Sequence, residues 1–304
     1  MKNPSKRITW KEISRQKFLM VCAAIFFVYG IVFYYVPLAG WVMAFQDYKP
    51  KDGLFGSKFV GLAKFKFLFS DDVFLRDIRN TLAMGVLNLV TTFLMAIIFA
   101  ILLNEVRNMF GKKLVQTVSY LPHFLSWIVV TGILHDALSS TGIINEMLVN
   151  LGILNSPINF FANPGYFWPI VAFANVWKET GIVYLAAITS IDPSLYEAAT
   201  LDGAGRWGKI WHVTLPGIKS TIMILLIMNI GNVLNAGFEV QYLLGNGLVK
   251  SVSETIDIYT LTWGISQNDY SLGTAAGIFK SVVAIILILG ANWIAKRAGE
   301  DRLF

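Results

Sequence analysis

The chain has 304 residues, of which 55% are hydrophobic and only 14% are charged, a balance typical of a protein solvated by lipid and well beyond what a soluble core needs. Its formal net charge of +6 does not indicate a nucleic-acid-binding protein, because the basic residues flank apolar segments instead of forming a stripe with interleaved aromatic side chains. Cys22 is the single cysteine, which excludes an intrachain disulfide and a metal site built from cysteines.

Six apolar segments are long enough to cross a membrane, since about 20 helical residues span about 30 Å of hydrocarbon. They are residues 18–36, 82–103, 114–134, 167–190, 221–236 and 273–295. We therefore expect an all-α integral membrane protein of the cell membrane, with six transmembrane helices in a single domain over residues 18–304. Membrane lipid is an expected partner, and nucleic acid is not.

The first span follows a basic arm, residues 1–17. The span is too long for a signal-peptide core and no small-residue cleavage site follows it, so we interpret it as a retained anchor with a cytoplasmic arm. An even number of spans then places both termini in the cytoplasm. The short loops agree with this orientation, because lysines and arginines are more frequent in those on the cytoplasmic side, although the first outer loop is also basic.

The third span carries a polar and aromatic face. Gln116, Tyr120, His123 and Trp127 recur at positions i, i+4, i+7 and i+11, so they share one face of a helix that Pro122 can kink. This face either lines a polar pathway or packs between helices. We favour the pathway for Tyr120 and leave both interpretations open for the histidine, since no second histidine lies nearby in the sequence to indicate a metal site.

The fourth span contains two adjacent charges, Lys178 and Glu179. A lysine at the middle of a span costs roughly 2.5–3.5 kcal/mol on insertion scales, so Lys178 should face protein or water and have a partner. Glu179 is not expected to be that partner, because adjacent residues of a helix point about 100° apart. The two side chains either line a pathway or form ion pairs with another span.

A polar segment separates the fourth and fifth spans. Asp192, followed by proline, is a helix start, because its carboxylate can accept from free backbone N–H groups. Gly203 can end this helix in a left-handed conformation, and Leu215-Pro216 is expected to close a second short helix. We expect a hairpin that projects into the cytoplasm and fits a cleft in a partner protein.

This polar segment resembles the coupling motif of ABC importer permeases, whose pattern is Glu-Ala-Ala, three residues, glycine, nine residues, isoleucine, one residue and Leu-Pro. The matching residues are Glu197, Ala198, Ala199, Gly203, Leu215 and Pro216, with Val213 in place of the isoleucine. The resemblance implies a permease like those of type I importers, with a cytoplasmic coupling-helix hairpin over about residues 191–216. These residues, named the coupling segment below, would dock on a separate ATPase subunit, where Glu197 is expected to pair with a basic residue.

The resemblance also implies the partners of the chain. They are a second homologous permease, ATP-binding ATPase subunits and an extracellular sugar-binding protein. Gly203, Gly205 and Gly208 form a G-x-G-x-x-G pattern, but it lies between membrane spans and not in a βαβ unit, so we reject a dinucleotide site. The sequence contains no G-x-x-x-x-G-K-[ST], so ATP and magnesium are expected on the ATPase partner and no cofactor on this chain.

Several shorter stretches resemble the oligosaccharide and polysaccharide branch of these permeases. They are residues 60–65, 69, 74, 80–82, 121–124, 177–181, 191–193 and 235–239. Together they favour carbohydrate over amino acid, peptide or metal cargo.

The fifth span carries Asn229, Asn232 and Asn235 at intervals of three residues, with Glu239 one turn further. Planar amides suit sugar hydroxyls and aromatic rings suit their C–H faces, so we interpret this stripe as part of a sugar pathway. The alternative is that the asparagines join helices, with on average only ~0.6 kcal/mol per hydrogen bond in membranes.

The sixth span contains Lys280, which either lines the pathway, forms an ion pair or extends its long stem toward the interface. Gly273 and Gly277 at its start allow close helix contact, within this chain or with another permease.

We therefore expect a permease subunit, not itself an enzyme, of an ATP-driven importer for oligosaccharides or polysaccharide fragments. One alternative is a permease for a different small solute. Another is an ion-coupled secondary transporter, which should show internal repeats, broken helices and intramembrane acids. A membrane enzyme would need a constellation such as paired aspartates, or serine with histidine, near one membrane face, and none stands out.

Overall fold

The computed structural model describes residues 16–106, 108–188, 191–297 and 299, and these are almost entirely helical. The basic arm predicted at residues 1–17 lies outside them except for its last two residues. Within this described part of the chain, four helices are long and apolar enough to cross a membrane, or five if one bent pair counts as a span. The four are Lys17–Phe45, Asp72–Asn104, Trp127–Asn150 and Tyr270–Arg297, and the bent pair is Arg206–Lys219 with Thr221–Gly231.

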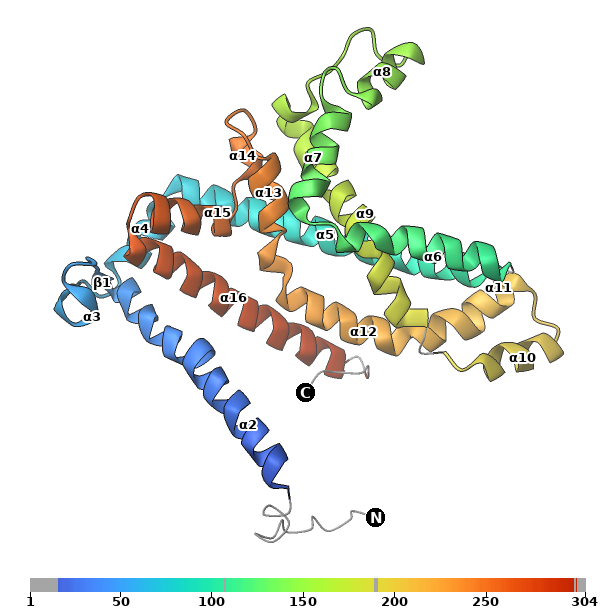
Figure 1. The fold of residues 1–304 in the computed structure, drawn as a ribbon, viewed down its shortest axis with the longest axis horizontal. Helices are drawn as coiled ribbons and strands as arrows, with labels where there is room; N and C mark the ends of the chain where they lie inside the picture. The colour runs from blue at the N-terminus through green and yellow to red at the C-terminus, as the bar shows by residue number, and fades with distance from the viewer. Residues whose placement is uncertain (1–15, 107, 189–190, 298, 300–304) are drawn as a thin grey trace.

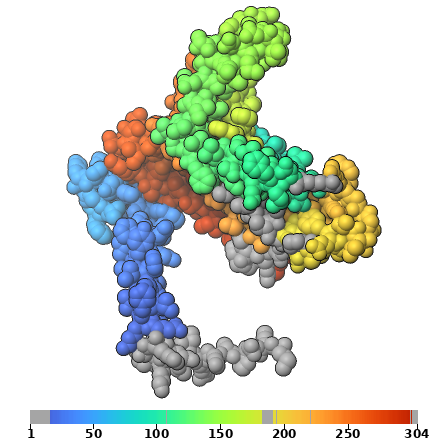
Figure 2. Space-filling model, turned by 45° about the vertical axis from the view of Figure 1, so that its right-hand side comes forward, coloured from blue at the N-terminus to red at the C-terminus, as the bar shows by residue number. Residues whose placement is uncertain are grey.

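The first helical run starts apart from the other helices (Figures 1 and 2), reaches α16 at its end and continues beyond the predicted end at residue 36. Its parts are α2 (Lys17–Gly30), the π-helical turn η1 (Ile31–Tyr35) and the 3-10 helix η2 (Val36–Phe45). A small excursion follows, in which two short strands pair antiparallel with Gln46 opposite Phe59. Its elements are β1 (Gln46–Asp47), α3 (Gly53–Gly56), β2 (Lys58–Phe59) and α4 (Ala63–Ser70).

The central helix is α5 (Asp72–Asn104), which begins where the Asp71 carboxylate accepts from the backbone nitrogen of Val73 at 3.0 Å. It packs along α9 (Pro164–Ile188), which contains most of the predicted fourth span; residues 189–190 of that span lie outside the described part of the chain. Buried apolar side chains from α5, α7, α9 and α13 form the largest core cluster. It includes Met84, Val130, Phe167, Val171, Ala174 and Val240.

The prediction of one continuous third span over residues 114–134 is wrong. α6 (Met109–Phe124) ends two residues after Pro122, which cannot donate a backbone hydrogen bond. α7 (Trp127–Leu138) then starts afresh, with the Ser126 hydroxyl accepting from the nitrogen of Val129 at 3.3 Å. Trp127 therefore does not share a helix face with the other three polar and aromatic residues of the predicted stripe.

α7, α8 (Ile143–Asn150), the 3-10 turn η3 (Phe160–Ala162) and the start of α9 project from the rest of the bundle, at the top of Figure 1. Asn145 fixes the segment between α7 and α9 by joining two parts of it through hydrogen bonds. Its amide nitrogen donates to the carbonyl oxygens of Ser139 and Ile158 at 2.7 and 2.9 Å.

The predicted fifth span, residues 221–236, is also interrupted. α12 (Leu215–Gly231) ends before Asn232, and the 3-10 turn η5 (Val233–Asn235) leads to Ala236 and Gly237, both with positive φ, of 43° and 77°. Left-handed residues cannot continue a right-handed helix. The chain turns there into α13 (Phe238–Leu244), so the three asparagines and Glu239 do not follow one helix face.

The last helices are α14 (Lys250–Ser253), α15 (Ile256–Leu261), the π-helical turn η6 (Thr262–Ser266) and α16 (Tyr270–Arg297). A Cβ atom on Gly273 would lie 2.7 Å from the Cα of Gly264, so this glycine serves a close contact within the chain. A Cβ atom on Gly277 would meet no described atom within 4 Å, so that position is not needed for packing in this chain alone.

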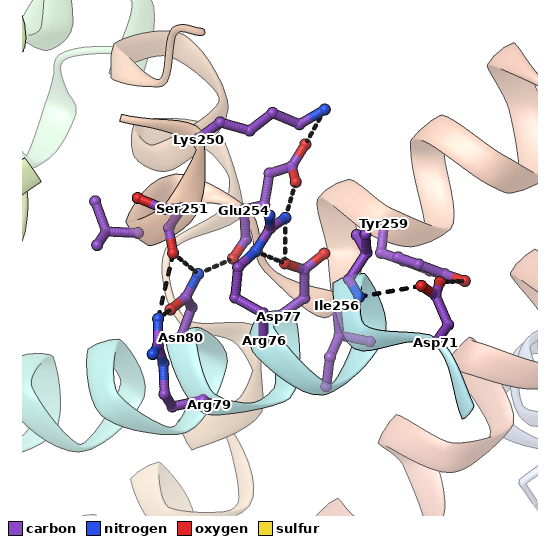
Figure 3. A network of polar contacts seen from close by, with 12 residues as sticks. Asp71, Arg76, Asp77, Arg79, Asn80, Lys250, Ser251, Glu254, Ile256 and Tyr259 are labelled. Atoms are coloured by element: carbon purple, nitrogen blue, oxygen red, sulfur yellow. Dashed lines mark hydrogen bonds and ion pairs between the residues drawn. The ribbon is translucent and has the colours of Figure 1, made fainter. Parts of the chain in front are cut away.

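A polar network fastens α14 and α15 to the first turns of α5 (Figure 3). Arg76 forms ion pairs with Glu254 and with its buried neighbour Asp77, and Lys250 lies 3.2 Å from Glu254. Asn80, also buried, donates to the carbonyl oxygen of Glu254 at 2.9 Å. The network therefore holds one end of α5 firmly against the loop before α15.

Two further hydrogen bonds extend this network along α15. The Tyr259 hydroxyl donates to Asp71 at 2.8 Å, and the nitrogen of Ile256 donates to the Thr81 hydroxyl at 2.9 Å. Burial, together with the hydrogen bond to Asp71, raises the pKa of Tyr259 above its usual value. The phenol is therefore a permanent donor at physiological pH.

Candidate functional site

The coupling segment begins as predicted. The carboxylate of Asp192 accepts from the nitrogen of Ser194 at 2.9 Å, which lowers the pKa of this aspartate, and α10 (Pro193–Leu201) follows. Gly203 adopts the predicted left-handed conformation with a φ of 77°, and the nitrogen of Ala204 donates back to Ala199 at 2.9 Å. The end of α10 is thus set by residues close to it in the sequence.

The prediction that Leu215-Pro216 closes a second short helix is wrong. α11 (Arg206–Lys209) passes through the π-helical turn η4 (Ile210–Thr214) directly into α12, where Pro216 lies in the first turn. Proline in a helix displaces the turn before it, and the wider π-helical turn accommodates the ring without ending the helix. The coupling segment is therefore continuous with the fifth span, which gives it a direct mechanical connection to α12.

The coupling segment exposes charged side chains together with large apolar ones. Glu197 and Ala198 are exposed, and Glu197 forms no ion pair with any residue that the structure describes. Three large apolar side chains of the same segment are Leu201, Trp207 and Trp211, which are 90%, 75% and 63% exposed. The segment lies at one end of the molecule, on the right of Figure 1. Exposed large apolar side chains are typical of a protein interaction surface.

Lys178 and Glu179 both contact the end of α6. The Lys178 nitrogen donates to the carbonyl oxygen of His123 at 2.7 Å and lies 5.5 Å from the centre of the Trp127 ring. Glu179 lies 3.1 Å from Nδ1 of His123 and 3.8 Å from the Lys178 nitrogen. The prediction that Lys178 faces protein and has a partner is confirmed, although the neighbouring glutamate, expected to point elsewhere, also reaches it.

The break between α6 and α7 explains the intramembrane lysine. The last carbonyl groups of α6 have no intrahelical donors and carry the negative end of the helix dipole. Lys178 from α9 supplies both a hydrogen bond and a positive charge to that end. The structural role of Lys178 is therefore to provide a hydrogen-bond donor and a positive charge for the C-terminal end of α6.

A pocket of about 280 Å³ lies where α5, α9 and the break after α12 meet. It brings together Glu179 and the three asparagines of the predicted stripe. The polar residues that line it are Asn88, Thr92, Asn175, Glu179, Asn229, Asn232 and Asn235. Irregular backbone at membrane depth occurs where it lines a cavity or is buried in protein, and the turn at residues 232–237 does the former.

The pocket offers hydrogen-bond acceptors as well as donors. The amide nitrogens of Asn229 and Asn232 donate to carbonyl oxygens of α12 at 2.8 and 3.2 Å, and that of Asn235 donates to Asn232 at 3.2 Å. The buried Oδ1 of Asn88 accepts from no residue in the described part of the chain. Each of these bonds uses one of the two N–H groups of its amide, so the side chains can both accept from and donate to the hydroxyl groups of a ligand.

A larger pocket of about 800 Å³ shares the same turn. Asn235 and Gly237 line both pockets, and Glu239 and Asp257 line only the larger one. The Lys280 nitrogen contacts both carboxylate oxygens of Asp257 at 2.6 and 2.7 Å. Of the interpretations left open for this lysine, the structure therefore supports the ion pair.

Some predicted pathway residues line neither pocket. Tyr120 packs against the buried cluster of Ala96, Ala100 and Leu103. His123, Trp127 and Lys178 lie beside the smaller pocket, behind Glu179, and do not line it. The predicted stripe is therefore divided into residues that line a pocket and residues that hold the helices around it.

The sequence interpretation missed Asn88, Asn175 and Gly85, which complete the smaller pocket from α5 and α9. Asn88 and Asn175 are isolated polar residues within apolar spans, and such residues usually face protein or a cavity, so this signal could have found them. Gly85 has no such signal, because its importance comes from a contact distant in sequence. A Cβ atom there would lie 2.0 Å from the carbonyl oxygen of Val233.

Residues 92–300 match a family model described as the binding-protein-dependent transport system inner membrane component. The match covers more than half of the chain. The chain belongs to this family. It is thus a multi-pass permease, in which the coupling segment and both pockets are parts of a transport protein.

Relatives of this permease are similar over almost its whole length. The polygalacturonan/rhamnogalacturonan transport system permease protein YteP of Bacillus subtilis (strain 168) is 45% identical, over 100% of this chain and 95% of that protein. Protein LplB of the same organism is 43% identical, over 98% and 95%. A solved bacterial ABC transporter involved in the import of the acidic polysaccharide alginate has a chain 39% identical, with a TM-score of 0.86, over 95% of this chain and 98% of that one.

An Asn229→Ala variant of the permease is expected to raise the KM for transport by roughly three- to tenfold, because one ligand hydrogen bond contributes about 0.5–1.5 kcal/mol. The measurement is ATP-dependent uptake of a labelled substrate by reconstituted transporter. Asn155→Ala, at an exposed loop position, is the matched control and should transport normally. An unchanged KM with lower thermal stability in Asn229→Ala would assign this asparagine to helix packing.

A Lys280→Met variant is expected to lower the free energy of unfolding by about 1–2 kcal/mol, because it leaves the partly buried Asp257 without its cation. Replacing both members, Lys280→Met with Asp257→Leu, should cost less than the single change. Thermal unfolding of the purified permease in detergent measures the stability of the single and of the double variant. A single variant as stable as the wild type would show that the ion pair contributes nothing.

Proposed function

We propose that this permease imports oligosaccharides derived from acidic polysaccharides, as one half of the membrane pathway of an ATP-driven transporter. The observation that carries the proposal is the 45% identity, along the whole chain, to a permease named for polygalacturonan and rhamnogalacturonan transport. The similarity to a chain of an alginate importer supports the same class of cargo. The amide-lined pocket between α5, α9 and α12 is consistent with a hydroxyl-rich ligand.

The proposed pathway passes along the broken helices. The residues assigned to it are Tyr120, His123, Trp127, Lys178, Glu179, Asn229, Asn232, Asn235 and Glu239. Of these, Glu179, Asn229, Asn232 and Asn235 line the smaller pocket and would contact sugar, while Lys178 and His123 would keep Glu179 in place. The proposed topology has six spans in one domain over residues 18–304, with α6 and α7 together forming the third and both termini in the cytoplasm.

The coupling segment is the proposed docking site for the ATPase. Glu197, Ala198, Ala199, Gly203, Leu215 and Pro216 carry this assignment. The exposure of Glu197 and of Leu201, Trp207 and Trp211 supports it, because these side chains are available to a partner protein. ATP and magnesium would bind to the ATPase subunits, so this chain holds no cofactor and catalyses no reaction. Ligand and nucleotide would each stabilise one of two packings of the helices.

The proposed assembly also contains a second homologous permease and an extracellular sugar-binding protein. One neighbour, a bacterial alginate ABC transporter, was solved in complex with an alginate pentasaccharide-bound periplasmic protein, and its chain is 39% identical to this one. That complex supports the binding-protein partner.

The cargo class is tested by ATP hydrolysis of the assembled transporter with its binding protein. Oligogalacturonides and alginate oligosaccharides are compared with a neutral oligosaccharide of the same length. Stimulation by an acidic oligosaccharide and not by the neutral one is expected. Stimulation by the neutral sugar alone would contradict the acidic cargo while leaving the importer itself intact.

A further inference from the structure

The hydroxyl of Tyr196 joins the coupling segment to helix α5. It accepts from the amide nitrogen of Asn104 at 3.2 Å and lies 3.0 Å from the Thr214 hydroxyl. The Thr214 hydroxyl donates to the carbonyl oxygen of Lys209 at 3.3 Å. Since each hydroxyl has one proton, Tyr196 must donate to Thr214, and the bonds run in one direction from α5 through α10 and η4 to α11.

The other contacts of the coupling segment are weaker restraints. Arg206 lies 3.7 Å from Glu105, but its side chain is 65% exposed, and exposed ion pairs contribute little. Lys209 donates to the Thr200 hydroxyl at 2.8 Å, which joins the two halves of the segment to each other and not to α5. The Tyr196 hydroxyl is therefore the best-placed link between α10 and the body of the permease.

Helix α5, which contributes Asn104 to this hydrogen bond, is itself held by contacts along its length. The network in Figure 3 fastens its beginning, and Gly85 lies in backbone contact with Val233 at its middle. α5 has 33 residues and is therefore about 50 Å long. Asn104 is the last residue of α5. A displacement of α5 along or about its axis therefore moves the hydrogen-bond donor of Tyr196.

Adjacent residues of α10 face different surroundings, one the body of the permease and the other the outer surface. Tyr196 points to the buried Thr214, which is 1% exposed, while Glu197 is exposed on the outer surface. Consecutive helix positions lie about 100° apart, so one faces the permease body and the next faces outward.

We propose that Tyr196 is a positioning residue that makes α10 move with α5, so that the state of the membrane pathway reaches an ATPase docked on the coupling segment. This inference rests on the proposed docking of that segment. The hydroxyl touches neither sugar nor ATP. The hydroxyl keeps α10 in a fixed orientation relative to α5. Without the hydroxyl, α10 adopts orientations that do not depend on the state of the membrane pathway.

The test is Tyr196→Phe, which removes one oxygen atom and keeps the ring. Cargo-stimulated ATP hydrolysis should fall about three- to tenfold, the effect of one hydrogen bond, and the ATP hydrolysed per sugar imported should rise. Basal ATP hydrolysis, co-purification of the ATPase and the Tm should match the wild type. Tyr35→Phe removes an exposed hydroxyl from η1 and should change nothing.

A double-mutant cycle separates a shared link from two independent effects. Asn104→Ala should lower stimulation like Tyr196→Phe, and the double variant should be no worse than the more severe single one. Additive losses would overturn the link. Loss of ATPase co-purification in Tyr196→Phe would also overturn it, by making Tyr196 part of the docking surface itself.

The result for Gly203→Val distinguishes this inference from the proposed function. If Gly203→Val uncouples the transporter while Tyr196→Phe behaves as wild type, the positioning role is wrong and the docking proposal stands. If both variants keep normal stimulation, the docking proposal is wrong and the positioning role falls with it.

Discussion

Gly203→Val is expected to abolish cargo-stimulated ATP hydrolysis while the permease still inserts and folds. The glycine has a φ of 77°, and a β-branched residue in that conformation is strained by about 1–3 kcal/mol. A Cβ atom there would meet no described atom within 4 Å, so the effect arises from the backbone and not from a clash. The turn after α10 relaxes, and the relative direction of α10 and α11 changes.

Gly205→Ala is the matched control for this variant. It is another glycine of the coupling segment with open space at its Cβ position, but its φ of −70° is ordinary for any residue. The measurements are stimulated ATP hydrolysis, co-purification of the ATPase and the amount of permease in the membrane. Normal stimulation in Gly203→Val would remove the basis for assigning the coupling segment to the ATPase.

Gly85→Ala is expected to destabilise the permease by about 3 kcal/mol or to prevent its accumulation. The added methyl group would lie 2.0 Å from the carbonyl oxygen of Val233 and 2.9 Å from its carbonyl carbon. These are backbone atoms of the turn that lines both pockets, so the contact is relieved only by separating α5 from that turn, and overpacking of this kind typically costs 1–3 kcal/mol or more.

Gly132→Ala in α7 is the control, because a Cβ atom there meets no described atom within 4 Å. Helix propensity alone should make this variant as stable as the wild type or slightly more stable. Thermal unfolding in detergent and the amount of permease in the membrane are measured for both variants, Gly85→Ala and Gly132→Ala. A Gly85→Ala protein with wild-type stability would show that α5 and the turn after α12 do not pack this closely.

The local geometry of the coupling segment could be predicted because neighbouring residues determine it. Asp192 caps the helix that follows it, and Gly203 adopts the only backbone region that ends that helix in this way. The second half was predicted less well. Leu-Pro is a frequent helix end, but the π-helical turn before Pro216 lets the helix continue, and nothing in the local pattern indicates that turn.

The apolar spans were predicted from composition, whereas their interruptions were not. A hydropathy window averages over about 20 residues and does not register the two residues between α6 and α7 or the left-handed pair at 236 and 237. Both breaks depend on distant residues. Lys178 supplies the donor for the end of α6, and Gly85 makes room for the turn after α12.

Broken helices and intramembrane acids were expected only of the alternative, an ion-coupled secondary transporter. The structure has such breaks, at α6–α7 and after α12, and Glu179 lies beside a pocket. Membership of the binding-protein-dependent family decides between the two classes. Helix breaks therefore indicate where a transported ligand can bind and do not indicate the energy source.

Uptake by proteoliposomes tests the central claim most directly. This permease would be reconstituted with its partner permease and ATPase subunits, and uptake of a labelled oligogalacturonide measured with the binding protein outside and ATP inside. We expect uptake that requires both ATP and the binding protein and that an ion gradient does not replace. Uptake driven by a proton or sodium gradient without ATP would contradict the claim that this chain is the permease of an ATP-driven sugar importer.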